Sequence, residues 1–197
     1  MAGLTSLAEV LHEEHFRILV GISDLQNWFS GDGNQCFSEV RYKQGEMEGL
    51  VGSLDHVLAH ETFEENVVFP LIRVQGAPDL ADFLAREHVA IAPATRKLRT
   101  LVIEILRHGP GAGRWRRFQQ LAQKLFPQVL DHLHTEELAI LQRLDRLLDI
   151  ETDHHLARQC LSSRPLSVAG RPGSLRLPDA RNDSVPGGAE LKRSRRR

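Results

Sequence analysis

The chain repeats two short patterns of His and Glu, once in each half of its first 150 residues. LAEVLHEEH at residues 7–15 returns as LADFLAREH at residues 80–88, and VLAHETFEE at residues 57–65 returns as VLDHLHTEE at residues 129–137. Packing requires repeated apolar residues, but it does not require repeated imidazoles and carboxylates. Each half supplies one His on an early segment and one HxxxE pattern on a late segment, which indicates that the two halves share a chemical role.

Four stretches of the chain place apolar residues at helical spacing and are separated by turn signals. They cover approximately residues 4–30, 38–69, 79–107 and 114–150. The alternation typical of strands is absent, and the connections are short, so the sequence predicts an all-α fold, an up-down-up-down four-helix bundle. Pro93 and Pro127 lie inside the last two stretches, where we expect a kink or local unwinding.

The net charge of −1 hides a division along the chain. Residues 1–151 contain 22 acidic and 15 basic side chains, whereas residues 152–197 contain 4 acidic and 10 basic ones. The second segment is rich in Ser, Pro, Gly and Arg and lacks periodicity, so we expect a bundle over residues 1–151 followed by a disordered basic tail over residues 152–197. Such a tail can contact nucleic acid or an acidic protein, but a solvated tail is the simpler interpretation.

Composition limits the location of the protein and the kind of metal site it can hold. No apolar stretch reaches the length of about 18 residues that a membrane helix needs, and the N-terminus lacks the pattern of a secretory signal. We therefore expect a cytoplasmic protein without a membrane partner. Cys36 and Cys160 are far apart and outside any CxxC pattern, which argues against a disulfide framework or a thiolate site. Any metal would have nitrogen and oxygen ligands.

Helix geometry tests whether the repeated polar residues can meet. Because successive residues are about 100° apart on a helix, Glu64 faces the same side as His60, and Glu136 the same side as His132. In mid-bundle these pairs, joined by one His from each partner helix, would surround one cavity. Buried carboxylates are costly without a cation, whereas this donor set suits iron, manganese, zinc or copper and allows two carboxylates to bridge a pair of metals. The candidate ligands are His15, His60, Glu64, His88, His132 and Glu136.

These six positions, together with EENVVFP after the first HxxxE pattern, resemble the hemerythrin-like, or HHE cation-binding, domain over residues 4 to about 150. That family is known for a non-haem di-iron centre, bridged by oxo or hydroxo, inside a four-helix bundle. The resemblance implies two non-haem iron ions (Fe2+/Fe3+) as the cofactor. It implies that His15 and His60 bind one iron, that His88 and His132 bind the other, and that Glu64 and Glu136 bridge them.

One position departs from the oxygen-carrying hemerythrins, which have a fifth imidazole where this chain has Ala92. Glu61 could supply an oxygen ligand instead, because its HExxE phrase resembles that of the iron-sensing hemerythrin-like domain of a ubiquitin-ligase F-box protein. The alternative is that Glu61 is a surface carboxylate. An additional carboxylate ligand would favour the ferric state, which makes sensing or storage a better expectation than reversible oxygen carriage.

Three functions from different classes remain open at this stage. The first is a binding or sensing module in which di-iron takes up oxygen, nitric oxide or iron itself, and the lack of an evident catalytic acid or base outside the ligands favours it. The second is a di-iron enzyme that acts on peroxide or nitric oxide, or that repairs iron-sulfur clusters as some family members do. Those repair proteins carry an additional N-terminal cysteine-bearing domain, whereas here the bundle begins at once. The third is a structural metal site, with zinc as the metal.

Overall fold

The computed structural model of the protein describes residues 6–29 and 44–164. The described residues form helices joined by short turns, and no strand occurs among them. The prediction of an all-α fold is confirmed for this part of the chain. Among the helices that the structure describes, none combines the length and the apolar character that crossing a bilayer requires.

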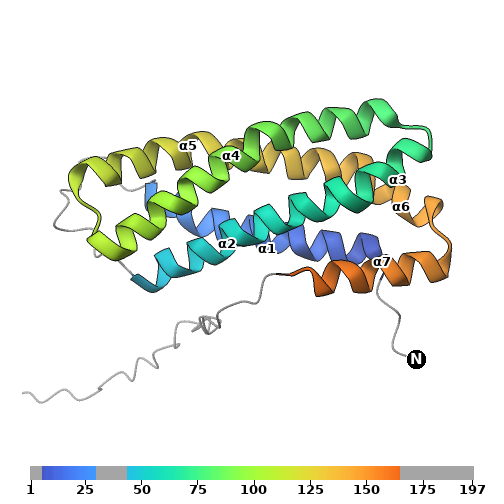
Figure 1. Cartoon of the computed structure of the whole chain (residues 1–197), viewed down its shortest axis with the longest axis horizontal. Helices are drawn as coiled ribbons and strands as arrows, with labels where there is room; N and C mark the ends of the chain where they lie inside the picture. The colour runs from blue at the N-terminus through green and yellow to red at the C-terminus, as the bar shows by residue number, and fades with distance from the viewer. Residues whose placement is uncertain (1–5, 30–43, 165–197) are drawn as a thin grey trace, which may run out of the picture.

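Four long helical rods lie side by side along the long axis of the molecule, and successive rods run in opposite directions (Figure 1). The first rod is α1 (Leu7–Phe29) and the third is α4 (Pro78–His108). The second rod consists of α2 (Gln44–Phe63), η1 (Glu64–Val68) and α3 (Phe69–Val74). The fourth consists of α5 (Ala112–Glu136), η2 (Glu137–Leu141) and α6 (Gln142–Leu147). Contacts between α1 and α2, α2 and α4, α4 and α5, and α5 and α1 close the rods around a common interior.

The tight turns between the rods depend on glycine. Gly76 has φ +90°, and Gly109 has φ +75°, a region of backbone conformation that side chains with a Cβ disfavour. The helices α4 and α5 continue through Pro93 and Pro127. The expected local unwinding at these prolines is therefore not observed, because a proline removes only one backbone hydrogen bond and the rest of the helix can continue.

Two short π-helical segments interrupt the second and fourth rods at equivalent places. One begins at Glu64 and the other at Glu137, directly after Glu136. A π-helical turn inserts one extra residue and changes the direction of the side chains that follow. Each segment lies directly beside two consecutive glutamates, one from the HxxxE pattern and the next along the chain.

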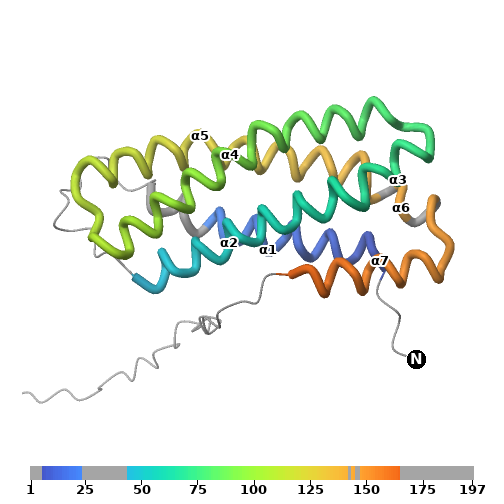
Figure 2. The backbone as a smooth tube through the Cα atoms, viewed as in Figure 1, coloured from blue at the N-terminus to red at the C-terminus, as the bar shows by residue number. Residues whose placement is uncertain are grey.

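The expected start of the tail at residue 152 is wrong. The chain continues as a further helix, α7 (Ile150–Ser162), which turns back beside α1 (Figure 2). Asp149 caps this helix by accepting a hydrogen bond from the Thr152 backbone N–H at 2.9 Å, and Ala157 and Cys160 are buried in the core. Burial of these few residues against α1 provides the ordering that composition alone did not predict. The remainder of the expected tail, residues 165–197, lies outside the described residues.

The core consists of two apolar clusters, one toward each end of the bundle, with a polar layer between them. Along α1, for example, Leu11 belongs to one cluster, Ile18 to the other, and the buried His15 lies between them. Helical spacing of apolar residues on either side of each buried polar residue explains the arrangement. The apolar clusters hold the rods together, and they also exclude water from the polar layer.

Candidate metal centre

The polar layer contains all but one of the buried polar side chains of the described residues. The buried polar side chains are Glu14, His15, His60, Glu61, Glu64, His88, Thr95, His132 and Glu136, and the exception is Thr95. Thr95 is satisfied by donating a hydrogen bond to the Ile91 carbonyl at 3.0 Å. The other eight residues come from α1, the second rod, α4 and α5, so all four rods contribute to one site.

The imidazoles approach one another in two pairs that correspond to the two halves of the duplication. Nε2 of His15 lies 3.0 Å from Nε2 of His60, and Nε2 of His88 lies 2.7 Å from Nε2 of His132. All four side chains are buried. Two imidazole nitrogens at this separation require a shared proton or a cation, because two facing lone pairs repel each other.

Each of the two HxxxE carboxylates reaches both imidazole pairs. Oε1 of Glu64 lies 3.4 Å from Nε2 of His60, while its Oε2 lies 3.6 Å from Nε2 of His88. The carboxylate thus presents one oxygen to each half of the site. It has the position required of a ligand that bridges two metals.

Glu136 also presents one oxygen to each imidazole pair, the nearer one to His132 on its own helix. Its Oε1 lies 3.2 Å from Nε2 of His132, and its Oε2 lies 3.5 Å from Nε2 of His15. Both oxygens of Glu136 are buried without a hydrogen-bond partner among the described residues, as is Oε2 of Glu64. Unsatisfied buried carboxylate oxygens are costly, and a metal ion would satisfy them.

The structure therefore brings six of the seven predicted ligands into two overlapping groups. His15 and His60 form the first group with Glu64 and Glu136, and His88 and His132 form the second with the same two carboxylates. Within each group the four possible ligand atoms lie within 4.8 Å of one another. The structure thus groups the residues as the resemblance implied, and ligation itself stays a prediction.

An outer layer of four carboxylates contacts the other ring nitrogen of every imidazole. In the first half of the site, Nδ1 of His15 is 2.7 Å from Oε1 of Glu137, and Nδ1 of His60 is 3.2 Å from Oε2 of Glu14. A carboxylate accepts the Nδ1 hydrogen and leaves the Nε2 lone pair free to face the interior. This is the tautomer that a metal ligand requires.

The second half repeats the pattern. Nδ1 of His132 is 2.8 Å from Oε2 of Glu87, and Nδ1 of His88 is 3.2 Å from Oε1 of Glu65. Sequence analysis missed these residues, although a signal for them is present. A Glu precedes the early His in both halves, and a second Glu follows the HxxxE pattern in both halves.

In the absence of a metal, the site must share protons among its closely spaced groups. Burial, together with the nearby Glu136 carboxylate, raises the pKa of Glu64 well above 4.5. Burial also opposes the charged form of His132, but the Glu136 carboxylate, 3.2 Å from its Nε2, and the Glu87 carboxylate outweigh this effect and raise its pKa to about 9. Burial lowers the pKa of His88 to about 4. At neutral pH the metal-free site therefore holds a proton on His132 and an uncharged imidazole at His88, and the raised pKa of Glu64 favours its protonated form.

Glu61 is buried beside the centre but belongs to neither group of possible ligands. Both of its carboxylate oxygens lack a hydrogen-bond partner among the described residues. Burial raises its pKa to about 8, and the nearby His132 only partly opposes this. Of the two alternatives for Glu61, the surface carboxylate is wrong because its side chain is 4% exposed.

Arg164, which follows the end of α7, also reaches the outer layer of the site. Nε of Arg164 donates to Oε1 of Glu14 at 2.7 Å, and Nε2 of His56 lies 4.0 Å from the same oxygen. Burial opposes ionisation of Glu14, but its hydrogen bonds with His60 and Arg164 lower its pKa from 4.5 to about 2. His56 is thus a neighbour of the outer layer, outside both groups of possible ligands.

Residues 6–144 match the family model described as the hemerythrin HHE cation binding domain. The chain belongs to this family. The matched stretch covers well over half of the protein and contains all seven predicted metal-site residues. No curated protein and no solved structure gives a match.

Membership of the hemerythrin family agrees with the chemistry of the site. A cation-binding function accounts for the facing Nε2 atoms, the unsatisfied carboxylate oxygens and the outer carboxylates that orient the rings. The donors are four imidazoles and two carboxylates. We conclude that this hemerythrin-domain protein has a His/Glu cluster able to hold metal.

Proposed function

We propose that this hemerythrin-domain protein holds two non-haem iron ions and uses them to bind or sense oxygen, nitric oxide or iron itself. The observation that carries the proposal is the position of Glu64 and Glu136, each of which offers one oxygen to each imidazole pair. A site for a single metal would not need two carboxylates that span both halves. Two divalent or trivalent cations would neutralise the carboxylates and satisfy their unpaired oxygens.

The residues of the chain perform the binding and the positioning in this proposal. Nε2 of each imidazole supplies a nitrogen ligand, and the outer carboxylates fix the rings in the required tautomer and raise their basicity. The apolar clusters on both sides exclude bulk water. When bound, iron would supply the redox chemistry with a small diatomic ligand.

The absence of a fifth imidazole shapes the proposed role. Ala92 occupies the position of the additional His of the oxygen carriers. Glu61 would supply an anionic oxygen in its place, and such a ligand favours the ferric state. Sensing or storage therefore fits this donor set better than reversible oxygen carriage.

One observation favours a second candidate, a di-iron enzyme that acts on peroxide or nitric oxide. In the metal-free protein Glu61 retains its proton near neutral pH, since burial raises its pKa to about 8, and a carboxyl group that keeps its proton beside a metal centre can act as a general acid. The same carboxyl group cannot be a metal ligand while it carries that proton. Its state in the metal-loaded protein therefore separates the two candidates.

Elemental analysis and an ultraviolet-visible spectrum of freshly purified protein test the proposal. We expect about two irons per chain, and charge-transfer bands that disappear on reduction with dithionite and return in air. A single zinc ion without colour would contradict it and leave a structural metal site. Rapid gas evolution from peroxide by the iron-loaded protein would favour the enzyme.

A further inference from the structure

Basic side chains concentrate at one end of the bundle. Residues 96–124 contain eight Lys and Arg and a single acidic residue, Glu104. The other parts of residues 1–151 contain seven basic and 21 acidic side chains. The bundle as a whole is therefore acidic, with one strongly basic region.

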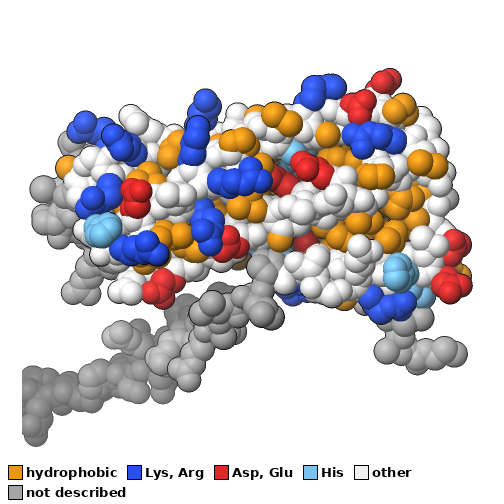
Figure 3. Space-filling view, viewed as in Figure 1, with side chains coloured by type: hydrophobic (Ala, Val, Ile, Leu, Met, Phe, Trp, Pro, Cys, Tyr) orange, Lys and Arg blue, Asp and Glu red, His pale blue; other side chains and the backbone are white. Residues whose placement is uncertain are grey.

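This basic region covers the end of α4, the beginning of α5 and the turn that joins them. In Figure 3, Lys and Arg side chains gather over the half of the visible face that carries this turn. Such a concentration of one sign of charge attracts partners of the opposite sign and increases their association rate.

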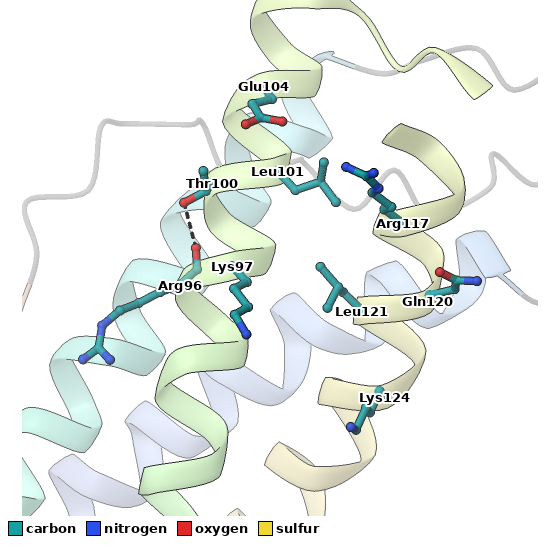
Figure 4. Close-up of a pocket in the computed structure, with 9 residues that line it drawn as sticks. All are labelled: Arg96, Lys97, Thr100, Leu101, Glu104, Arg117, Gln120, Leu121 and Lys124. Carbon is teal, nitrogen blue, oxygen red and sulfur yellow. Dashed lines mark hydrogen bonds between the residues drawn. The ribbon is translucent and has the colours of Figure 1, made fainter. Parts of the chain in front are cut away.

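A surface groove of about 670 Å³ runs between α4 and α5 within the basic region (Figure 4). Leu101 from α4 and Leu121 from α5 face each other across it and form an apolar floor. Lys97 lies toward one end of the groove on α4, with Lys124 on α5 at the same end, while Arg117 lies toward the other end. The groove therefore combines an apolar floor with walls that carry four cations and one acidic residue, Glu104, which lies at the same end as Arg117.

The cations of the groove are available to an external ligand. Arg99, on the neighbouring side of α4, is paired with Asp55 of α2. By contrast, Lys97, Arg117 and Lys124 form no ion pair with any other residue that the structure describes. Their charges are therefore not used in ion pairs within the described part of the bundle.

The arrangement of these groups selects one class of ligand. The cations are spread over about two helical turns, or about 10 Å, so they do not converge on a single small anion. A phosphate backbone would use the cations but would leave the leucine floor unused, and no aromatic side chain lines the groove to stack on a base. An amphipathic helix with Asp or Glu beside an apolar stripe would use both features, as in other complexes in which a helix lies in a groove.

We propose that the groove between α4 and α5 is a docking site for an acidic amphipathic helix of a partner protein. Leu101 and Leu121 receive its apolar side chains, while Lys97, Arg117 and Lys124 pair with its carboxylates. The contact spans only about two turns, so the complex is transient and weakens as salt screens the ion pairs. The proposal does not depend on which metal the protein holds.

Fluorescence anisotropy with the purified full-length protein tests this proposal. The probe is a labelled peptide of about five helical turns with a leucine stripe and Glu on its other faces. A peptide of the same composition in scrambled order, the same peptide with Lys in place of Glu, and a short DNA duplex serve as comparison ligands. We expect binding of the Glu/Leu helix at low salt, weaker binding of the scrambled peptide, and no binding of the Lys peptide.

Two double charge-reversal variants distinguish binding in the groove from attraction by the overall positive charge of the region. Lys97→Glu with Lys124→Glu should weaken binding of the helix by about tenfold or more. Arg107→Glu with Arg116→Glu makes the same change in net charge at exposed positions outside the groove lining, and should weaken it by less than about threefold. Circular dichroism checks that both variants are folded.

Three results would overturn the proposal. Equal losses in the two variants would mean that the helix responds only to overall charge. Equal affinity for the scrambled peptide would exclude a role for the leucine floor. Tighter binding of DNA than of the peptide, with loss in the groove variant, would assign the groove to nucleic acid instead.

Discussion

Nε of Arg164 donates a hydrogen bond of 2.7 Å to Oε1 of Glu14. The other oxygen of Glu14 is 3.2 Å from Nδ1 of His60, so a residue just beyond α7 is linked to a candidate metal ligand through one carboxylate. Glu87, the counterpart of Glu14 in the second half, forms no ion pair with an Arg or Lys among the described residues. The duplicated centre is therefore asymmetric in its surroundings.

Replacement of Arg164 with Ala should destabilise the metal-free protein by about 2 kcal/mol, because the buried Glu14 would lose its cationic partner. Arg158→Ala provides the control, since Arg158 is exposed on α7, the helix that precedes Arg164. Chemical denaturation of both variants measures the difference. Equal stabilities of the two variants would show that the ion pair contributes nothing.

The same contact changes the expected effect of truncation. A chain cut after residue 154 would lose Arg164 together with the buried Ala157 and Cys160, and should unfold at a lower temperature than the full chain. A chain cut after residue 166 retains these contacts and should keep the stability and the metal content of the full protein. Thermal unfolding of both truncated chains distinguishes the roles of α7 and of the residues that follow.

Replacement of His60 or His132 with Ala should reduce the metal content by at least one equivalent per chain, because each variant removes a nitrogen from one of the two groups. His134→Ala is a matched control, since His134 is exposed on the same helix as His132. Metal analysis after exhaustive loading provides the measurement. A ligand variant that still holds two equivalents would contradict the assignment.

Replacement of Glu87 with Gln should weaken metal binding in the second half by about tenfold to a hundredfold. The amide cannot accept the Nδ1 hydrogen of His132 as strongly as the carboxylate does, so the ring becomes a poorer ligand. Asp131→Asn removes a charge from an exposed position nearby and should have little effect. Calorimetric titration of both variants with the same metal tests this role of the outer carboxylate.

Metal binding at pH 7 should release at least about one proton per chain. The pKa of His132 is raised to about 9, so this imidazole holds a proton that a bound metal must displace, and the raised pKa of Glu64 adds to the release. Anaerobic titration with ferrous iron in buffers of different ionisation enthalpy counts the released protons. The number should fall as the pH rises toward 9, and heats that do not depend on the buffer would contradict the prediction.

Metal removal should lower the stability of the bundle. A metal that binds only the folded chain adds about 4 kcal/mol when its free concentration is a thousand times its Kd. The melting temperature of the metal-free protein should therefore be clearly lower than that of the loaded protein. Identical melting temperatures would argue against a buried site.

Replacement of Glu61 with Gln should stabilise the metal-free protein as the pH rises above 4.5. In the folded state the pKa of Glu61 is raised to about 8, so the unfolded chain loses this proton first, and the stability of the wild-type protein falls with rising pH between 4.5 and 8. The variant lacks this titrating group, so its free energy of unfolding should exceed that of the wild type by up to about 3 kcal/mol at pH 7. Near pH 4 the two proteins should be equally stable. Glu104→Gln, at an exposed position, is the control.

The metal-loaded form of the Glu61→Gln variant gives a separate result. If Glu61 is a ligand, loss of its negative charge should weaken binding of one metal and raise the reduction potential, because a carboxylate favours the ferric state. If Glu61 instead acts as a proton donor, metal affinity should be unchanged. Potentiometry and metal titration distinguish these outcomes.

The sequence by itself predicted the helical class and the six residues that surround the centre. Those predictions depend on periodic features, since apolar residues recur at helical spacing and the HxxxE pattern places His60 and Glu64 on the same side of one helix. The duplication then identified the partner residues in the second half. Local periodicity is visible without knowledge of the tertiary structure.

Only the tertiary structure decided which rods lie next to one another and what surrounds the imidazoles. It placed Glu137 against His15 and Glu65 against His88. The repeat marks these glutamates, but no local pattern specifies which imidazole each one contacts. It also placed α7 against α1, where burial of Ala157 and Cys160 stabilises a helix that the composition of this segment did not predict. Helix formation follows from neighbours along the chain, whereas the environment of a buried charge depends on residues that only the packed fold brings into contact.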